Sequence, residues 1–227
     1  MGNQAVRERR LILFVDSCMH AVYNNEKRRR RKERRAVELL EELEAYQPWN
    51  EQEERDRAEL LRRLKSGEEL YSRENLSAHL TASAWVVSPD RQRVLMAYHN
   101  LYDSWAWLGG HADGDRDLLA VALRETREES GLTEVRPVSP GIYSVEILTV
   151  DGHEKRGTYV PSHLHLNVTY LLEADPAAPV RCRPEENSRV GWFALADAPA
   201  VSSEPWMRER VYCKLNAKLD GFLHKMI

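Results

Sequence analysis

Three glutamates stand close together in the segment GGHADGDRDLLAVALRETREESGL, residues 109–132. Glu125, Glu128 and Glu129 are spaced i, i+3 and i+4, which places their carboxylates on one patch of a helix. Like charges at this spacing repel one another unless a counter-ion is bound, and carboxylate oxygens are the ligands that hard divalent cations prefer. The segment therefore predicts either a metal site or a solvated acidic face, which is the commoner meaning of such a run.

The residues around these glutamates favour the metal site. The segment resembles the Nudix box of Nudix hydrolases, a loop–helix motif that ends in an R-E pair, an aliphatic residue, an E-E pair, glycine and a second aliphatic residue. The matching residues are Gly110, Arg124, Glu125, Glu128, Glu129, Gly131 and Leu132. The short strand expected before Gly109 and the helix expected after it supply the local context that the motif requires.

Two positions depart from the motif. The early acidic position of the loop is Arg116, with Asp115 and Asp117 on either side, and the aliphatic position before the E-E pair is Thr126. The early acid of the family is a structural partner of the box arginine. We therefore expect Asp115 or Asp117 to pair with Arg124 instead.

The resemblance implies hydrolysis of a pyrophosphate bond in a nucleoside diphosphate linked to a further moiety. It also implies Mg²⁺, with Mn²⁺ as the alternative, bound by Glu125, Glu128, Glu129 and the carbonyl of Gly110. Glu128 or Glu129 would act as the general base. Arg124 would orient the loop and a glutamate by ion pairing.

A further glutamate is expected near this site. Some Nudix enzymes place one more metal-binding or basic glutamate on a loop shortly before a strand that contains tryptophan. Glu186 lies six residues before Trp192 and is the first choice, with Glu185 second and Glu186 as the alternative general base. A solvated loop glutamate is an equally good interpretation of either residue.

Histidines and aromatic residues are candidates for substrate contacts. His111 follows the glycine pair, where it could contact phosphate, and His163 and His165 share one face of a strand because they are two residues apart. The His-x-His pair also hints at zinc, but no cysteine or third histidine has a supporting spacing, so zinc is not expected. The rings available to stack on a base are Trp85, Trp105, Trp107, Tyr143 and Tyr159.

The elements that position these residues are predicted from residue 76 onward. Strands are expected at residues 78–87, 93–99, 105–108, 134–138, 143–150, 162–173 and 190–194, with a polar loop at residues 151–157. Helices are expected at residues 116–130, which would bury Leu119, Leu123 and Thr126, and at residues 206–226. This order resembles the Nudix α/β/α sandwich with a mixed sheet, and the fold class is α/β.

Residues 1–75 are predicted to be a highly charged, N-terminal helical extension to a Nudix domain at residues 76–227. Two or three helices are expected. One lies at residues 5–24, where a strand at residues 11–15 is the alternative, and one lies at residues 26–46, which Pro48 ends. Another begins after Pro48, with Asn50 as its cap and Ala58, Leu61 and Leu64 on its apolar side. The basic run KRRRRKERR, residues 27–35, is interpreted as a solvated helix face in preference to an RNA-binding surface. A homodimer formed through these helices is a further alternative.

The composition limits the class of partner. The net charge is only −3 although 30% of the residues are charged, which argues against a strongly basic nucleic-acid binder. The three cysteines are widely spaced, which favours reduced thiols and a cytoplasmic protein. The apolar run at residues 11–15 is too short to cross a membrane, so no membrane partner is expected.

Two other functions share the fold. The first is a regulatory module that binds a nucleotide or RNA without cleaving it, with the basic segment as its effector part. The second is an enzyme like the isomerase of isopentenyl diphosphate. The complete set of box glutamates favours the hydrolase over the pure binder.

Overall fold

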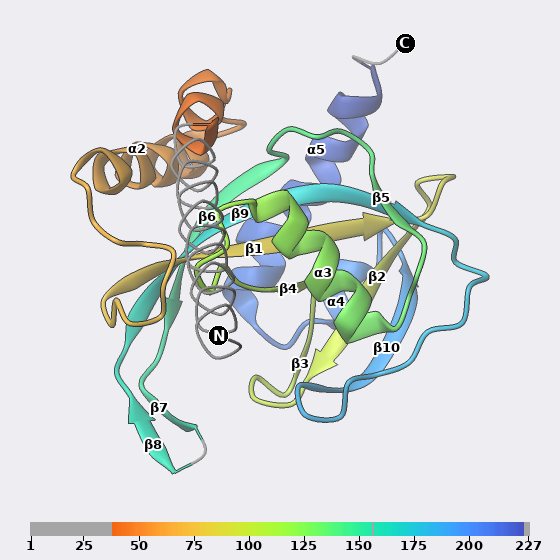
Figure 1. Ribbon diagram of the computed structural model, residues 1–227. Coiled ribbons are helices and arrows are strands. Elements are labelled where there is room, and N and C mark those ends of the chain that lie inside the picture. Colours follow the sequence, from red (N-terminus) through yellow and green to blue (C-terminus); the bar gives the residue numbers. More distant parts are fainter. Residues whose placement is uncertain (1–37, 156, 225–227) are drawn as a thin grey trace, which may run out of the picture. The chain divides into compact units, whose positions relative to one another are not determined.

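The computed structural model describes residues 38–155 and 157–224 (Figure 1). The chain divides into two compact units, and the larger one, Glu42–Ile227, carries the elements below. The helix predicted at residues 5–24 and the basic run at residues 27–35 lie outside the described residues. None of the helices within the described ranges is both long enough and apolar enough to cross a membrane.

Helix α2 (Glu51–Lys65) begins as predicted, because the side chain of Asn50 accepts a hydrogen bond from the Glu53 N–H at 3.0 Å. Its predicted apolar side is only partly correct, because Leu61 and Leu64 are half-buried. Glu53 and Leu60 are the buried residues, whereas Ala58 is exposed. The reason is a buried ion pair between the Glu53 carboxylate and Lys218, which turns this side of the helix inward.

The sheet is mixed, as predicted. Its strands are β1 (Ala78–Val87), β2 (Arg93–His99), β3 (Ser104–Ala106), β4 (Leu108–His111), β5 (Val135–Pro137), β6 (Ser144–Val150), β9 (His163–Ala174) and β10 (Asn187–Ala194). The order along the main path is β10-β2-β1-β9-β5, while β3 pairs with β2, β4 with β1 and β6 with β9. β1 and β9 are parallel, and the other pairs are antiparallel.

Two predicted segments differ from the structure. The single strand expected at residues 105–108 is two strands, β3 and β4, because Trp107 turns its N–H to the hydroxyl of Tyr212 at 3.3 Å. The polar loop expected at residues 151–157 includes a strand, β7 (His153–Lys155), which pairs with β8 (Thr158–Val160) just beyond it to form a small hairpin. A pattern of polar residues alone did not reveal that hairpin.

Helix α3 (Leu118–Ser130) carries the box glutamates. Asp117 caps its first turn by accepting the Ala120 N–H, and Gly131 ends it in a left-handed conformation with φ of 71°. The predicted buried stripe is only partly correct, since Leu119 and Leu123 are half-buried. The buried residues are Leu118, Val121, Ala122, Thr126, Glu129 and Ser130. The inward face therefore includes one of the glutamates.

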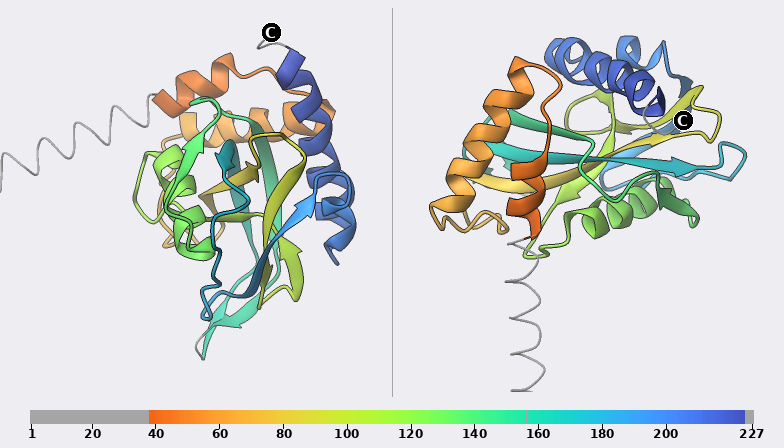
Figure 2. Two further views of the ribbon diagram at one scale, coloured as in Figure 1. Left: turned by 90° about the vertical axis from the view of Figure 1, so that its right-hand side faces the viewer. Right: turned by 90° about the horizontal axis from the view of Figure 1, so that it is seen from above.

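Helices cover both faces of the sheet (Figure 2). α3 lies on one face, and the C-terminal segment α4 (Ala198–Val201), η1 (Met207–Tyr212) and α5 (Cys213–His224) lies on the other. On this second face the indole ring of Trp85 stacks on the ring of Tyr212 at 5.4 Å. Val211, Leu215 and Leu219 are buried there as predicted. The α/β/α sandwich is thus confirmed.

The predicted domain boundary near residue 75 lies inside the larger compact unit, Glu42–Ile227. α2 lies in the same compact unit as the sheet and packs beside β6, where the Ile147 N–H donates to the Asp56 carboxylate at 3.1 Å. Division into an extension at residues 1–75 and a domain at residues 76–227 stays a prediction.

Candidate active site

The glycine pair at the end of β4 brings the backbone into close contact with its neighbours. Gly110 is opposite Ala82 on β1. A Cβ atom on Gly109 would lie 2.6 Å from the Ala82 carbonyl oxygen, and one on Gly110 would lie 2.7 Å from the Glu125 Cδ atom. The absence of side chains at both positions therefore lets β4 join the sheet and lets the Glu125 carboxyl group lie against the loop.

Glu129 is the most buried of the box glutamates. Its Oε2 atom accepts the Gly109 N–H at 3.0 Å. Burial, together with the negative charges of Glu125 and Glu186, raises the pKa of Glu129 to about 8 against the lowering effect of that hydrogen bond. Burial also raises the pKa of Glu125, and the Arg124 guanidinium opposes this. Glu125 and Glu129 therefore lie in a setting that disfavours their ionised forms.

The loop before β10 joins this group through an arginine that the sequence interpretation missed. The Arg183 Nη1 atom lies 2.9 Å from Glu128 and 3.2 Å from Glu186. Glu185, the second choice, is 78% exposed and 3.7 Å from Arg183. The Asn187 side chain donates to the backbone carbonyl of Glu129 at 3.1 Å, which fastens the loop to the end of α3. Glu186 therefore lies beside the box, although nothing in the local sequence marked Arg183 as the link.

Arg124 occupies the place expected of the box arginine. Its guanidinium lies 2.9 Å from Glu125 and 3.8 Å from Asp115, so the second contact takes the place of the missing early acid. Asp117 instead caps the helix. Arg116 turns away to pair with Glu69 at 3.1 Å.

Thr126, the other departure from the motif, is buried in α3. Its hydroxyl donates to the Ala122 carbonyl at 2.7 Å, so its one polar group is satisfied within the helix. A threonine therefore fits the position where the family places an aliphatic residue.

The donor set around Glu125, Glu128, Glu129 and Glu186 suits a hard cation. Carboxylate oxygens dominate it, and the Gly110 backbone lies directly against Glu125. The raised pKa values of Glu125 and Glu129 also favour a cation site, because a bound cation would stabilise the ionised carboxylates that burial disfavours. The residues present thus fit Mg²⁺ or Mn²⁺.

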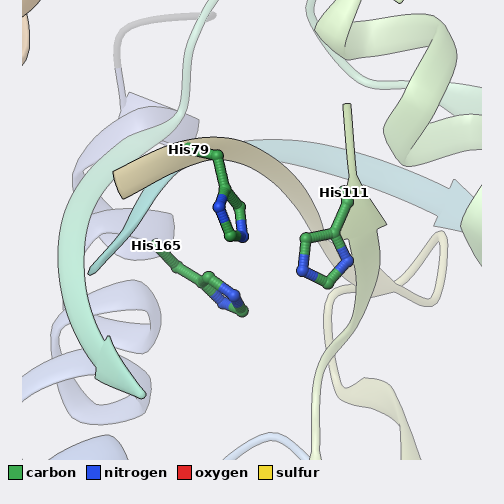
Figure 3. Close-up of side chains that lie close together, drawn as sticks. All are labelled: His79, His111 and His165. Carbon is green, nitrogen blue, oxygen red and sulfur yellow. The ribbon is translucent and has the colours of Figure 1, made fainter. Parts of the chain in front are cut away.

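Two of the histidines predicted to contact substrate, His111 and His165, lie close together in Figure 3, and the third, His163, contacts His165. The rings of His111 and His165 are 4.9 Å apart, and the Nε2 atoms of His163 and His165 are 3.2 Å apart. His79 on β1 completes the group, with its ring 5.1 Å from both His111 and His165. The sequence interpretation missed His79, although it falls on the same strand face as the polar residues Thr81 and Ser83.

The aromatic candidates divide by burial. Trp85 and Tyr143 are buried in the core, so these two rings are not available to stack on a base. Trp105 and Trp107 are half-buried, and Tyr159 is 68% exposed. The Arg189 guanidinium lies over the Tyr98 ring at 4.0 Å and covers Trp105 at 5.2 Å.

A family model for the NUDIX domain matches residues 77–214. The chain belongs to the Nudix family. This confirms the predicted family and the prediction of a Nudix-type hydrolase at the level of the family. The search of curated proteins found no significant match.

Three of the solved structures to which the chain is similar are the following. The Ap4A hydrolase of C. elegans is 19% identical, over 64% of this chain and 98% of that one, with a TM-score of 0.43. The dihydroneopterin triphosphate pyrophosphohydrolase of E. coli is 15% identical, over 64% and 97%, with a TM-score of 0.46. The NUDIX domain of NrtR from Shewanella oneidensis, solved with ADP ribose, is 18% identical, over 63% and 87%, with a TM-score of 0.43.

Proposed function

We propose that this protein hydrolyses a pyrophosphate bond in a nucleoside diphosphate derivative, with Mg²⁺ as its cofactor. The observation that carries the proposal is the group of carboxylates at the glycine turn, where Glu125 and Glu129 contact the loop and Glu128 and Glu186 share Arg183. A protein that only binds a nucleotide has no need of this arrangement.

The residues that would hold the ion are Glu125, Glu128, Glu129 and the Gly110 carbonyl, with Glu186 from the loop. When bound, Mg²⁺ or Mn²⁺ supplies positive charge that offsets the phosphate charge and lowers the pKa of water. The neighbouring arginine keeps these ligands in position. Arg124 holds Glu125 and the loop in place through its two ion pairs.

The general base is one of three carboxylates. The Glu128 side chain is 43% exposed, so water reaches it, and Arg183 holds it. Glu129 is buried and its pKa is raised to about 8, so it would accept a proton only while a bound cation keeps it ionised. Glu186 is the loop alternative. Substituting each of the three glutamates separately and measuring the remaining rate of hydrolysis would identify the base.

The substrate-binding proposal rests on His111, His163 and His165. His111 follows Gly110 on β4, and its ring lies 4.9 Å from that of His165 on β9, so this group would contact a part of the substrate beyond the reacting phosphates. Trp107 and Tyr159 are the candidates that remain for stacking on a base.

A cytoplasmic location and a homodimer formed through residues 1–75 also stay predictions. Cys182 and Cys213, the two cysteines within the described ranges, are free thiols, which is consistent with a reducing compartment.

The test is a panel of nucleoside diphosphate derivatives incubated with the full chain and Mg²⁺, with products separated by chromatography. We expect turnover of at least one member, and loss of that turnover when a chelator removes the metal. Glu128→Gln is the matched control for contaminating hydrolases. Tight binding of one member without turnover of any would favour a regulatory binder, and isomerisation of isopentenyl diphosphate would favour the isomerase.

A further inference from the structure

Histidines from four strands gather at the end of the sheet that carries the glycine turn. They are His79 on β1, His111 on β4, His153 on β7, and His163 and His165 on β9. Neighbouring ring centroids are 4.7 Å apart for His79 and His163, and 6.5 Å apart for His153 and His163. Because β1 and β9 are parallel with His79 opposite His165, strand pairing assembles the group.

Three of these residues have the geometry of a ligand set. His79, His111 and His165 each offer a ring nitrogen, and the three nitrogens lie within 4.8 Å of one another (Figure 3). Zn²⁺ binds imidazole nitrogen at about 2.0–2.1 Å in a tetrahedral site, which separates ligand nitrogens by roughly 3.4 Å. Small rotations of the side chains are therefore enough to close the three rings around one ion.

The hydrogen bonds select the ring nitrogen that would bind. The Nδ1 atom of His79 lies 3.1 Å from the Asn75 carbonyl oxygen, and because a carbonyl only accepts, Nδ1 carries the proton. The lone pair is then on Nε2, which is buried and has no hydrogen-bond partner among the described residues. A buried acceptor left unsatisfied is unfavourable, and metal-binding histidines commonly have this second hydrogen bond to a carbonyl.

His163 supports the group from the side. Its Nδ1 atom lies 2.8 Å from the Pro161 carbonyl oxygen, so its Nε2 atom accepts the hydrogen bond from Nε2 of His165 at 3.2 Å. The lone pair of His165 is therefore on its Nδ1 atom, which is the atom that would bind a metal ion. This contact holds the His165 ring in place without adding a charge.

Imidazole nitrogen selects the type of ion, because it suits Zn²⁺ and other transition metals, whereas Mg²⁺ prefers oxygen ligands.

We propose that His79, His111 and His165 form a binding site for one transition-metal ion of the Zn²⁺ type, distinct from the carboxylate site on α3. His163 is a positioning residue for His165. Three protein ligands leave a fourth coordination position that water or a phosphate oxygen can fill. The proposal goes beyond the hydrolase function and does not depend on it.

The experiment uses the full chain after removal of metal with a chelator. Zn²⁺ is added in the presence of excess Mg²⁺, binding is followed by titration calorimetry, and retained zinc is counted by elemental analysis after desalting. We expect one Zn²⁺ per chain, and at least a 10-fold weaker affinity in His111→Gln and in His165→Gln. Co²⁺ bound in place of Zn²⁺ gives a visible absorption spectrum that these substitutions change.

Two control variants test whether Zn²⁺ binds at this histidine cluster and not at other side chains of the protein. His99→Gln removes a histidine outside the cluster and should retain Zn²⁺, and Glu128→Gln should retain Zn²⁺ while it removes hydrolysis. Circular dichroism checks folding, and because His79→Gln changes a buried residue, the half-buried His111→Gln is the decisive variant. Absence of Zn²⁺ binding in the wild type would overturn the proposal, as would undiminished binding in folded His111→Gln and His165→Gln.

Discussion

The carboxylates on α3 and the histidine cluster meet at two successive residues of β4. Gly110 faces Glu125 of α3, and His111 lies among the histidines. Successive residues of a strand point to opposite faces of the sheet, so one strand presents two kinds of ligand on its two sides. Three of the carboxylates come from one helix, whereas the histidines come from four strands. A contiguous motif thus builds one site and strand register builds the other.

The largest effect should come from the carboxylates. We expect Glu128→Gln and Glu129→Gln to lower kcat by about 10²–10⁴-fold, as loss of a general base or a cation ligand does. Steady-state kinetics on the substrate found in the panel would measure this, with Zn²⁺ binding unchanged in the same variants. Full activity in both variants would show that the metal-site assignment is wrong.

The next largest effect concerns the polar network on the same sheet face as the histidines. The Glu53 carboxylate lies 2.6 Å from Lys218, 3.2 Å from Lys214 and 2.7 Å from the Ser144 hydroxyl. Glu53→Gln leaves two buried ammonium groups under-compensated, so we expect the free energy of unfolding to fall by about 3–5 kcal/mol. Urea unfolding measures it, and a loss below about 1 kcal/mol would contradict this account.

The same residue should produce a pH dependence. Burial alone would raise the pKa of Glu53, but Lys214 and Lys218 outweigh burial and hold it at about 2, below its ordinary value of 4.5. The stabilisation is therefore complete above pH 4.5 and is lost as the pH falls toward 2. Unfolding measured across this range should show a smaller slope in Glu53→Gln than in the wild type, and equal slopes would refute the pKa.

The two glycines provide a matched pair. In Gly109→Ala the new methyl group meets the backbone of β1, so we expect a stability loss of about 1–3 kcal/mol. In Gly110→Ala it meets the Glu125 side chain, which can move, so we expect little loss of stability but a fall in kcat on the order of 10²-fold. Thermal unfolding and kinetics of both variants test this, and the reverse pattern would contradict the packing described.

The smallest effect should come from Asp115→Asn. Its contact with Arg124 is 3.8 Å long and its side chain is 46% exposed, so solvent screens the pair. We expect a stability change below about 1 kcal/mol and no change in Zn²⁺ binding. Thermal unfolding measures the first, and a larger loss would mean that this pair is essential to the loop.

Local signals predicted the parts of the fold that depend on neighbours in the chain. The caps Asn50 and Asp117 and the terminating Gly131 act through hydrogen bonds or backbone angles within a few residues, and the strands at residues 78–87 and 93–99 were predicted with the observed bounds. The buried sides of α2 and α3 were predicted less well. Apolar spacing shows which residues share a helix face, but the partner that covers a helix decides which face is buried.

The sequence by itself determined the family, the carboxylate spacing on α3 and the glycine turn, because these lie within one contiguous segment. Only the tertiary structure decided that Arg183 joins Glu128 to Glu186, and that His79 meets His111 and His165. The physical reason is register. These residues are brought together by pairing between β1, β4 and β9 and by the loop fastened to α3, and a pairing shifted by one residue would turn the histidines to the other face.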